Sequence, residues 1–193
     1  MRHQPLHDPK ILRAIAHPVR NRILGELDAR GPMRAADIAR ELGIPANQAS
    51  FHLRQLAKYG LVEEDPTAAR DRRDRVWKPT SPAGYAVDLK AVEEAPGGKA
   101  ASAVFRRSAS AWGHLVVDRV YSRDRVKGTL TSLTETALLL GRDEAEQFVA
   151  ELGEVVERWT ERTREAGGDR RTYLYYAAVL PYPDVERVEP GQD

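Results

Sequence analysis

The chain contains no cysteine among its 193 residues. This absence excludes disulfide bonds, thiolate redox chemistry and every metal site built on cysteine. Nitrogen ligands for a metal can come only from five histidines. The chain also lacks a run of about 20 apolar residues, which a membrane-spanning helix needs, and residues 1–5 lack the apolar core of a secretion signal. We therefore expect a cytoplasmic protein that makes no membrane contact.

Net charge is nearly absent as well, but the balance of +1 hides an uneven distribution. Residues 1–80 carry 15 Lys and Arg against 10 Asp and Glu, a balance of +5, whereas residues 81–193 carry 15 against 19, a balance of −4. A basic first part suits a polyanionic partner, although proteins that bind no nucleic acid can have the same balance. Hydrophobic residues make up 41% of the chain, which is enough to bury a core.

Signals for several helices follow one another in the first sixty residues. Asp8 and Pro9 match the cap and the first residue of a helix, and Pro18 divides the apolar run that follows into two helices. A short helix ends at Gly43, and another helix follows over residues 45–59. Two short extended segments, residues 61–64 and 75–78, then flank a charged loop in the manner of a hairpin.

The remaining sequence predicts a second part of different character. Residues 81–99 are interrupted by proline and glycine and indicate a linker, and a helix follows over residues 100–122. Residues 130–140 and 172–180 favour strands on either side of an amphipathic helix that starts near residue 143. We expect an α+β, mainly helical fold. It comprises a winged helix-turn-helix domain at residues 8–80 and, after the linker, a helix and a strand-helix-strand unit in a dimerisation and effector domain at residues 100–185.

The helix over residues 45–59 has two unlike faces. Ala49, Leu53 and Leu56 recur at i, i+4 and i+7 and form one apolar side. The opposite side and its flanks are polar and basic and suit the major groove, where Asn and Gln pair with adenine, Arg pairs with guanine, and an apolar group meets a thymine methyl. The candidate DNA-binding residues of this helix are Ala46, Asn47, Gln48, Ser50, Phe51, Arg54 and Lys58.

The charged loop of the hairpin supplies further candidates. Its arginines, Arg70, Arg72, Arg73 and Arg75, could contact phosphates or an adjacent minor groove as a wing. The alternative is a solvated turn in which Asp71 and Asp74 cancel much of the charge. His17 and His52 lie toward buried positions, so we interpret them as packing residues rather than as base contacts.

Three ordered motifs carry a resemblance to a known family. They are LRAIAHPVRNRIL at residues 12–24, ADIARELG at residues 36–43 and ASFHLRQLAKYGLV at residues 49–62. Together they resemble the DNA-binding core of ArsR-type winged-helix regulators, over about residues 8–80. The resemblance implies a homodimer on a two-fold site in double-stranded DNA, acting as a repressor that a signal releases. It also implies that Ala46, Asn47, Ser50 and Phe51 lie nearest the bases.

The chain departs from that family in two respects. Well-known members sense metals through cysteines, or through His and Asp on the last helix, and this chain has no cysteine. It also continues for more than a hundred residues beyond the wing, as longer ArsR-like regulators with an appended carboxy-terminal domain do. His114 and Asp118, four residues apart on a predicted helix, supply only two ligands, and two ligands do not make a zinc site. We therefore assign no metal and no cofactor, and leave the effector-binding residues unknown.

Two other functions remain as alternatives. A winged helix can serve as a protein-interaction module without specific DNA binding, in which case its DNA association would be weak and insensitive to salt. An enzyme would need a nucleophile–base pair, a phosphate loop or a metal constellation in the second part of the chain, and His114 with Asp118 comes nearest to one. The tyrosines and tryptophans after residue 110 could line a pocket for a small-molecule effector, or form ordinary core and dimer interface.

Overall fold

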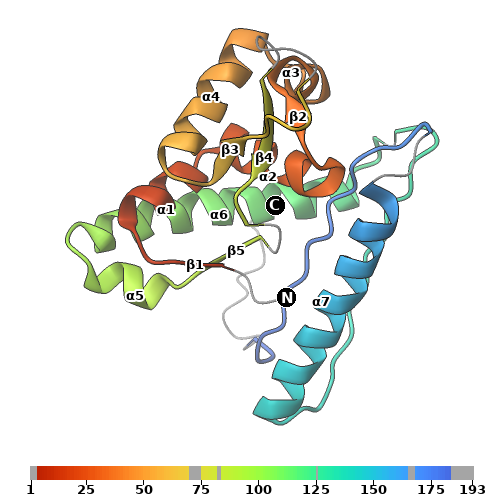
Figure 1. Cartoon of the computed structure of the whole chain (residues 1–193). Helices are drawn as coiled ribbons and strands as arrows, with labels where there is room; N and C mark the ends of the chain where they lie inside the picture. Colours follow the sequence, from red (N-terminus) through yellow and green to blue (C-terminus); the bar gives the residue numbers. More distant parts are fainter. Residues whose placement is uncertain (1–3, 70–74, 82–83, 125, 165–167, 184–193) are drawn as a thin grey trace.

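The computed structural model describes residues 4–69, 75–81, 84–124, 126–164 and 168–183. Its first part contains four helices, α1 (Pro9–Ile15), α2 (Pro18–Arg30), α3 (Ala35–Leu42) and α4 (Ala46–Lys58). Helices dominate the described chain and the strands are short (Figure 1). The predicted α+β, mainly helical class is therefore confirmed.

The starts of the first two helices follow from local chemistry. The carboxylate of Asp8 accepts a hydrogen bond from the backbone N–H of Lys10 at 2.7 Å and caps α1. His17 Nδ1 accepts from the N–H of Val19 at 3.2 Å and caps α2, directly before Pro18. Both caps satisfy N–H groups that a helix start leaves without partners. The predicted start at Asp8 and the predicted division at Pro18 are confirmed.

A three-stranded antiparallel sheet completes the winged helix-turn-helix. Its order is β2 (Met33–Arg34), β4 (Val76–Pro79), β3 (Val62–Glu64). Val62 pairs with Pro79 and Glu64 pairs with Trp77, so β3 and β4 form the predicted hairpin. Figure 1 shows this hairpin beside α3 and α4. Residues 70–74, in the middle of the connecting loop, lie outside the described residues.

The segment expected to connect the two parts of the chain contains elements of its own. β5 (Tyr85–Val87) pairs in parallel with β1 (Gln4–Leu6), and α5 (Leu89–Glu94) leads into α6 (Gly98–Tyr121). The hydroxyl of Tyr85 donates to the carbonyl oxygen of Leu61 at 2.6 Å. This segment therefore packs on the helix-turn-helix and does not form the free linker that the sequence predicts.

The buried core lies almost wholly in the first part of the chain. One apolar cluster joins α2, α3, α4 and the sheet, with Ile23, Leu27, Ile38, Leu53 and Leu56 at its centre. A smaller cluster of Leu12, Val92 and Ala101 joins α1, α5 and the first turns of α6. The helix predicted over residues 100–122 is present as α6, and only its beginning is buried. The apolar stripes of α2, α3 and α4 hold these helices in the core, as the periodicity of the sequence predicts.

The last part of the chain differs from the strand-helix-strand unit that the sequence predicts. The helix is present as α7 (Arg142–Arg164), and the side chain of Glu144 accepts from the N–H of Gly141 at 2.7 Å where it begins. Residues 129–140 and 171–183, all of them described, form no strand. Both segments run alongside α7 (Figure 1). No ladder of backbone hydrogen bonds joins either segment to another described strand, so the predicted strands are not formed.

Candidate nucleic-acid interface

Helix α4 presents the polar face that its sequence predicts. Ala49, His52, Leu53 and Leu56 are buried, and they hold α4 against the core. The opposite face is turned to solvent: the side chain of Phe51 is 49% exposed, and Asn47, Arg54 and Lys58 are also exposed. An exposed phenylalanine between polar residues is costly for a solvated helix but suits a groove that carries methyl groups.

A tight turn sets the position of α4 relative to α3. Gly43 ends α3 with a φ of +65°, a left-handed conformation that residues with a Cβ rarely adopt. The N–H of Ile44 donates to the carbonyl oxygen of Ala39 at 3.0 Å, and Pro45 then begins α4. Because the turn is short and fixed, α3 packs closely on α4 and braces it, as the first helix of a helix-turn-helix must.

The residues predicted to contact bases fall on one accessible surface. Ala46, Asn47 and Gln48 are exposed in the first turn of α4, and Ser50 is half-buried beside them. Asn47 Oδ1 accepts from the N–H of Gln48 at 2.9 Å. Pro45 at the cap offers no side-chain acceptor, so the N–H groups of this turn carry the positive end of the helix dipole toward the same surface. The first turn of α4 therefore combines the side chains that the sequence predicts to contact bases with a helix N-terminus, which favours anionic groups.

Of the four predicted wing arginines, the structure describes Arg75. Arg70, Arg72 and Arg73 lie outside the described residues. Arg75 is 63% exposed and its guanidinium lies 3.4 Å from the carboxylate of Glu64 on the neighbouring strand. An exposed ion pair of this kind is weak and leaves the arginine able to exchange its partner for a phosphate.

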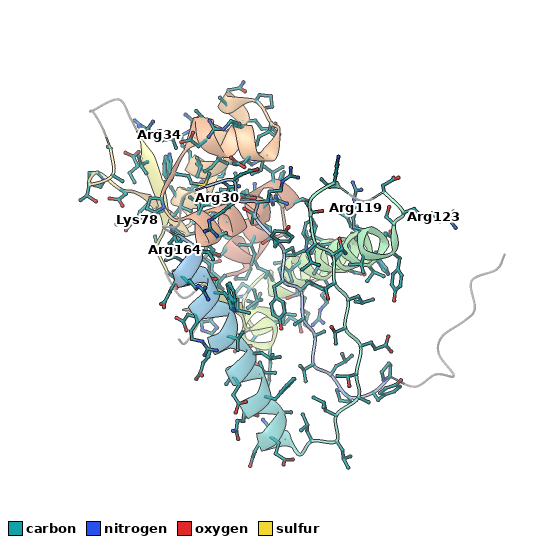
Figure 2. All side chains as sticks on the ribbon, turned by 90° about the vertical axis from the view of Figure 1, so that its right-hand side faces the viewer. Arg30, Arg34, Lys78, Arg119, Arg123 and Arg164 are labelled. Atoms are coloured by element: carbon teal, nitrogen blue, oxygen red, sulfur yellow. The ribbon has the colours of Figure 1, made fainter. Side chains whose placement is uncertain are left out.

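The structure adds basic residues that sequence reasoning missed. Arg34 precedes α3 and lines an open cavity of about 410 Å³ between α3 and the hairpin, together with Arg30 and Arg40. Asp37 and Glu41 line the same cavity, so its charge is mixed. Figure 2 shows Arg34 on the hairpin side of the molecule. The position before the bracing helix was the available signal, since that helix crosses the DNA backbone in helix-turn-helix proteins.

Two histidine rings in contact, with their planes tilted by 46°, lie on the buried side of α4. The ring centroids of His17 and His52 lie 4.7 Å apart, and His52 is 4% exposed. Burial lowers the pKa of His52, and the charges of His17 and Arg20 lower it further. Burial, with the charge of Arg20, also lowers the pKa of His17. Both residues pack inside the domain, as predicted, although among the described residues Nδ1 of His52 has no hydrogen-bond partner.

The depressed pKa of His52 predicts a loss of stability in mild acid. Below about pH 6.5 the unfolded chain binds a proton that the folded chain resists, so the free energy of unfolding falls by up to about 1.4 kcal/mol per pH unit for this residue. We expect urea denaturation to show a larger drop between pH 7.5 and pH 5.5 in the natural chain than in His52→Leu. Equal drops in the two chains would contradict this assignment.

The second part of the chain shows no comparable chemistry. His114 and Asp118 are exposed on α6, and no group of three His, Asp or Glu within the described residues is arranged to hold a metal ion. None of the described helices combines the length and the apolar character that crossing a membrane requires. Of the candidate sites that the sequence suggests, the exposed face of α4 is therefore the one whose side chains are arranged for a defined kind of contact.

Comparisons with known proteins agree with this location. Residues 15–65 match a protein family described as a helix-turn-helix domain. No curated protein matches the chain. A homodimeric winged helix-turn-helix DNA-binding domain from Mycobacterium bovis, a possible ArsR-family transcriptional regulator, shares 21% identity over 61% of this chain and 86% of that chain, with a TM-score of 0.31.

Two further solved structures are similar at the same level. A mutant of ZitR from Lactococcus lactis in apo form shares 19% identity over 75% of this chain and 83% of that chain, with a TM-score of 0.31. A mutant of MepR from S. aureus, bound to an oligodeoxyribonucleotide, shares 17% identity over 79% of this chain and 86% of that chain, with a TM-score of 0.32. The function is inferred from the geometry of α4 and from the family match, and not from these solved structures.

Proposed function

We propose that this chain, whose residues 15–65 carry a helix-turn-helix domain, is a dimeric, sequence-specific DNA-binding transcription regulator. We further propose that it is a repressor, released by a small ligand or another signal that does not involve a thiol. The observation that carries the proposal is the exposed face of α4, where Phe51 and Arg54 point to solvent while the opposite face is fixed in the core.

The roles of the residues follow from their chemistry and their exposure. Asn47, Gln48, Ser50, Phe51 and Arg54 read base edges in the major groove. Lys58, at the other end of α4, and the arginines of the wing contact the phosphate backbone, which contributes affinity but little sequence information. The fixed turn at Gly43 keeps these two groups of contacts in register.

A homodimer would present two copies of α4 to successive major grooves, about 34 Å apart. The apolar side of α1 is used within the chain, because Leu12 packs on α5 and α6. We therefore place a dimer contact on α6, whose later turns expose Leu115, Val117 and Tyr121. Sedimentation at working concentration measures this oligomeric state.

Hydrogen bonds connect the second part of the chain to α2 of the DNA-binding part, and a ligand bound to the second part could act through them. The guanidinium of Arg30 on α2 contacts Glu26 at 3.0 Å, Glu41 on α3 at 2.8 Å and the hydroxyl of Thr172 at 3.2 Å. The guanidinium of Arg164, at the end of α7, donates to the carbonyl oxygen of Asp28 at 3.0 Å. Figure 2 shows Arg30 and Arg164 at this junction. A ligand that shifts the second part would bias α2 and α3, provided that it binds the two states with different affinities.

The proposal is tested by comparing native upstream DNA with random DNA. We expect DNase protection at one site with two-fold symmetry, and an affinity for that site at least about 10³-fold higher than for random duplex. Equal affinity for both DNAs would leave the winged helix as a protein-interaction module. The salt dependence of each binding constant, measured in the same titrations, separates phosphate contacts from base contacts.

Removal of Arg75 should weaken binding to every sequence alike. We expect Arg75→Ala to lower the slope of log K against log salt by about one, with base preference unchanged, because the residue contributes a single phosphate contact. Glu64→Gln is the matched control, since it removes the partner carboxylate and leaves the arginine in place. If Arg75→Ala left the slope unchanged, Arg75 would belong to the solvated turn instead of the wing.

A further inference from the structure

Many apolar side chains in the second part of the chain are exposed and do not pack into a core. Every large hydrophobic side chain that is exposed among the described residues, apart from Phe51, lies between Val104 and Tyr182. In the part of the chain that the structure describes, every buried hydrophobic residue lies at or before Ala101. None of the α7 side chains, all within the described residues, is buried, although the helix carries a clear apolar stripe. An apolar surface of this extent marks an interaction site.

The exposed area is large enough for a stable interface. The chain exposes 14905 Å² in all, whereas a monomer of its mass, 21.6 kDa, is expected to expose about 9200 Å². Six aromatic side chains of the described residues are more than half exposed and leave roughly 100 Å² each, since a buried aromatic covers about 150–250 Å². They are Tyr121, Trp159, Tyr173, Tyr175, Tyr176 and Tyr182. Together with the neighbouring leucines they exceed the ~800 Å² per partner of a standard interface.

Residues 172–180 have the character of a strand that is covered on both faces. The run TYLYYAAVL contains no charge, and both of its alternating sets of side chains are mainly apolar. Leu174, Tyr176 and Leu180 belong to one set, Tyr173, Tyr175 and Val179 to the other, and all are exposed. No backbone hydrogen bond joins this run to another described residue. An uncharged edge of this kind would aggregate unless a defined partner covered it.

The same surface continues onto α6. A Cβ placed on Gly113 would lie 3.2 Å from the hydroxyl of Tyr176, so residues 172–180 pass directly against this helix. At the far end of α6 lie the exposed Leu115, Val117 and Tyr121. The N–H of Leu130 donates to the hydroxyl of Tyr173 at 3.3 Å, which joins residues 129–140 to the same side of α7.

We propose that a second copy of this chain covers this surface, and that residues 172–180 pair as a strand with the second copy. The proposal deepens the homodimer of the proposed function, since it places the contact on α7 and its two flanking segments as well as on α6. The area matches what a dimer needs, and the surface continues that of α6. An uncharged surface is complementary to itself, whereas a partner of other chemistry would need matching charges that this run does not offer.

The absence of cysteine provides a direct test. Single cysteines introduced in turn from Thr172 to Leu180 would each be the only thiol of the chain. Under mild oxidation, we expect some of these positions to form intermolecular disulfides about tenfold faster than an exposed cysteine on the DNA-binding part, because a disulfide needs Cα atoms about 4.4–6.8 Å apart. Asn21→Cys, exposed on α2, is the matched control.

Hydrogen exchange on the natural chain is the second measurement. We expect the amides of residues 172–180 to exchange slowly in the dimer, and Leu174→Lys to speed their exchange and shift sedimentation toward the monomer. A monomeric natural chain, or a dimer in which these cysteines react no faster than the control, would overturn the inference. Both measurements are made without DNA, so a dimer that pairs here but shows no preference for specific DNA would refute the proposed function alone.

Discussion

The double substitution Asn47→Ala with Arg54→Ala should strongly reduce discrimination between operator and random DNA. Each side chain makes one directional base contact worth about 1 to 3 kcal/mol. The two lie seven residues, about 10 Å, apart along α4, so their effects should add. We expect specific affinity to fall by about 2 to 6 kcal/mol, or roughly 30-fold to 10⁴-fold, while non-specific affinity falls far less. Competitive titration against random duplex measures both quantities.

The fold should survive this change, which makes the result interpretable. Both side chains are exposed, and exposed substitutions usually alter stability by less than about 0.5 kcal/mol. Arg119→Ala, on α6, removes one positive charge away from α4 and serves as the control for net charge. A double variant that still preferred its operator as strongly as the control would show that α4 does not read the sequence.

Replacing Arg30 with methionine should destabilise the DNA-binding part. The Glu26 carboxylate is buried at 1% exposure and is contacted by Arg30 at 3.0 Å, Arg22 at 2.8 Å and Thr172 at 2.6 Å. Loss of one partner of a buried ion pair costs about 3 to 5 kcal/mol. Because Arg22 and Thr172 remain, we expect about 2 to 3 kcal/mol from Arg30→Met in denaturant unfolding.

A double substitution separates this cause from lost packing. Glu26→Leu combined with Arg30→Met removes the buried charge with its partner, and we expect it to recover most of the lost stability. A double variant as unstable as Arg30→Met alone would contradict the ion-pair explanation. Thr172→Val supplies a milder comparison, since it removes one hydrogen bond to Glu26 and keeps both arginines.

Titration of Glu26 should give this network a signature in acid. Burial raises the pKa of Glu26, but hydrogen bonds from Thr172 and Arg22, followed by the charge of Arg22 and a hydrogen bond from Arg30, outweigh it and hold the pKa below its ordinary value. The stabilisation is therefore present above about pH 4.5 and is lost as the pH falls from there toward the lower folded pKa. This pH range lies below the range in which protonation of His52 lowers the free energy of unfolding.

The site and the fold were predictable to different degrees. The two faces of α4, the cap at Asp8, the division at Pro18 and the end of α3 at Gly43 depend on neighbours within a few residues, and so the pattern of consecutive residues indicated them. The strands expected at residues 130–140 and 172–180 were recognised by composition, but a strand forms only where another edge is available. Sequence reasoning also passed over Arg34, because its relation to the hairpin depends on the pairing of β2 with β4.

What consecutive residues determined by themselves is local: which helices form, where they begin and end, and which side of α4 turns outward. Tertiary structure alone decided the attachment of residues 81–99 through β1 and β5, and the contacts of Thr172 with Glu26 and Arg30, which are 146 and 142 residues away along the chain. The reason is physical. Helical hydrogen bonds and caps close over three or four positions, whereas strand pairing and buried ion pairs need partners whose approach depends on the packing of the whole chain.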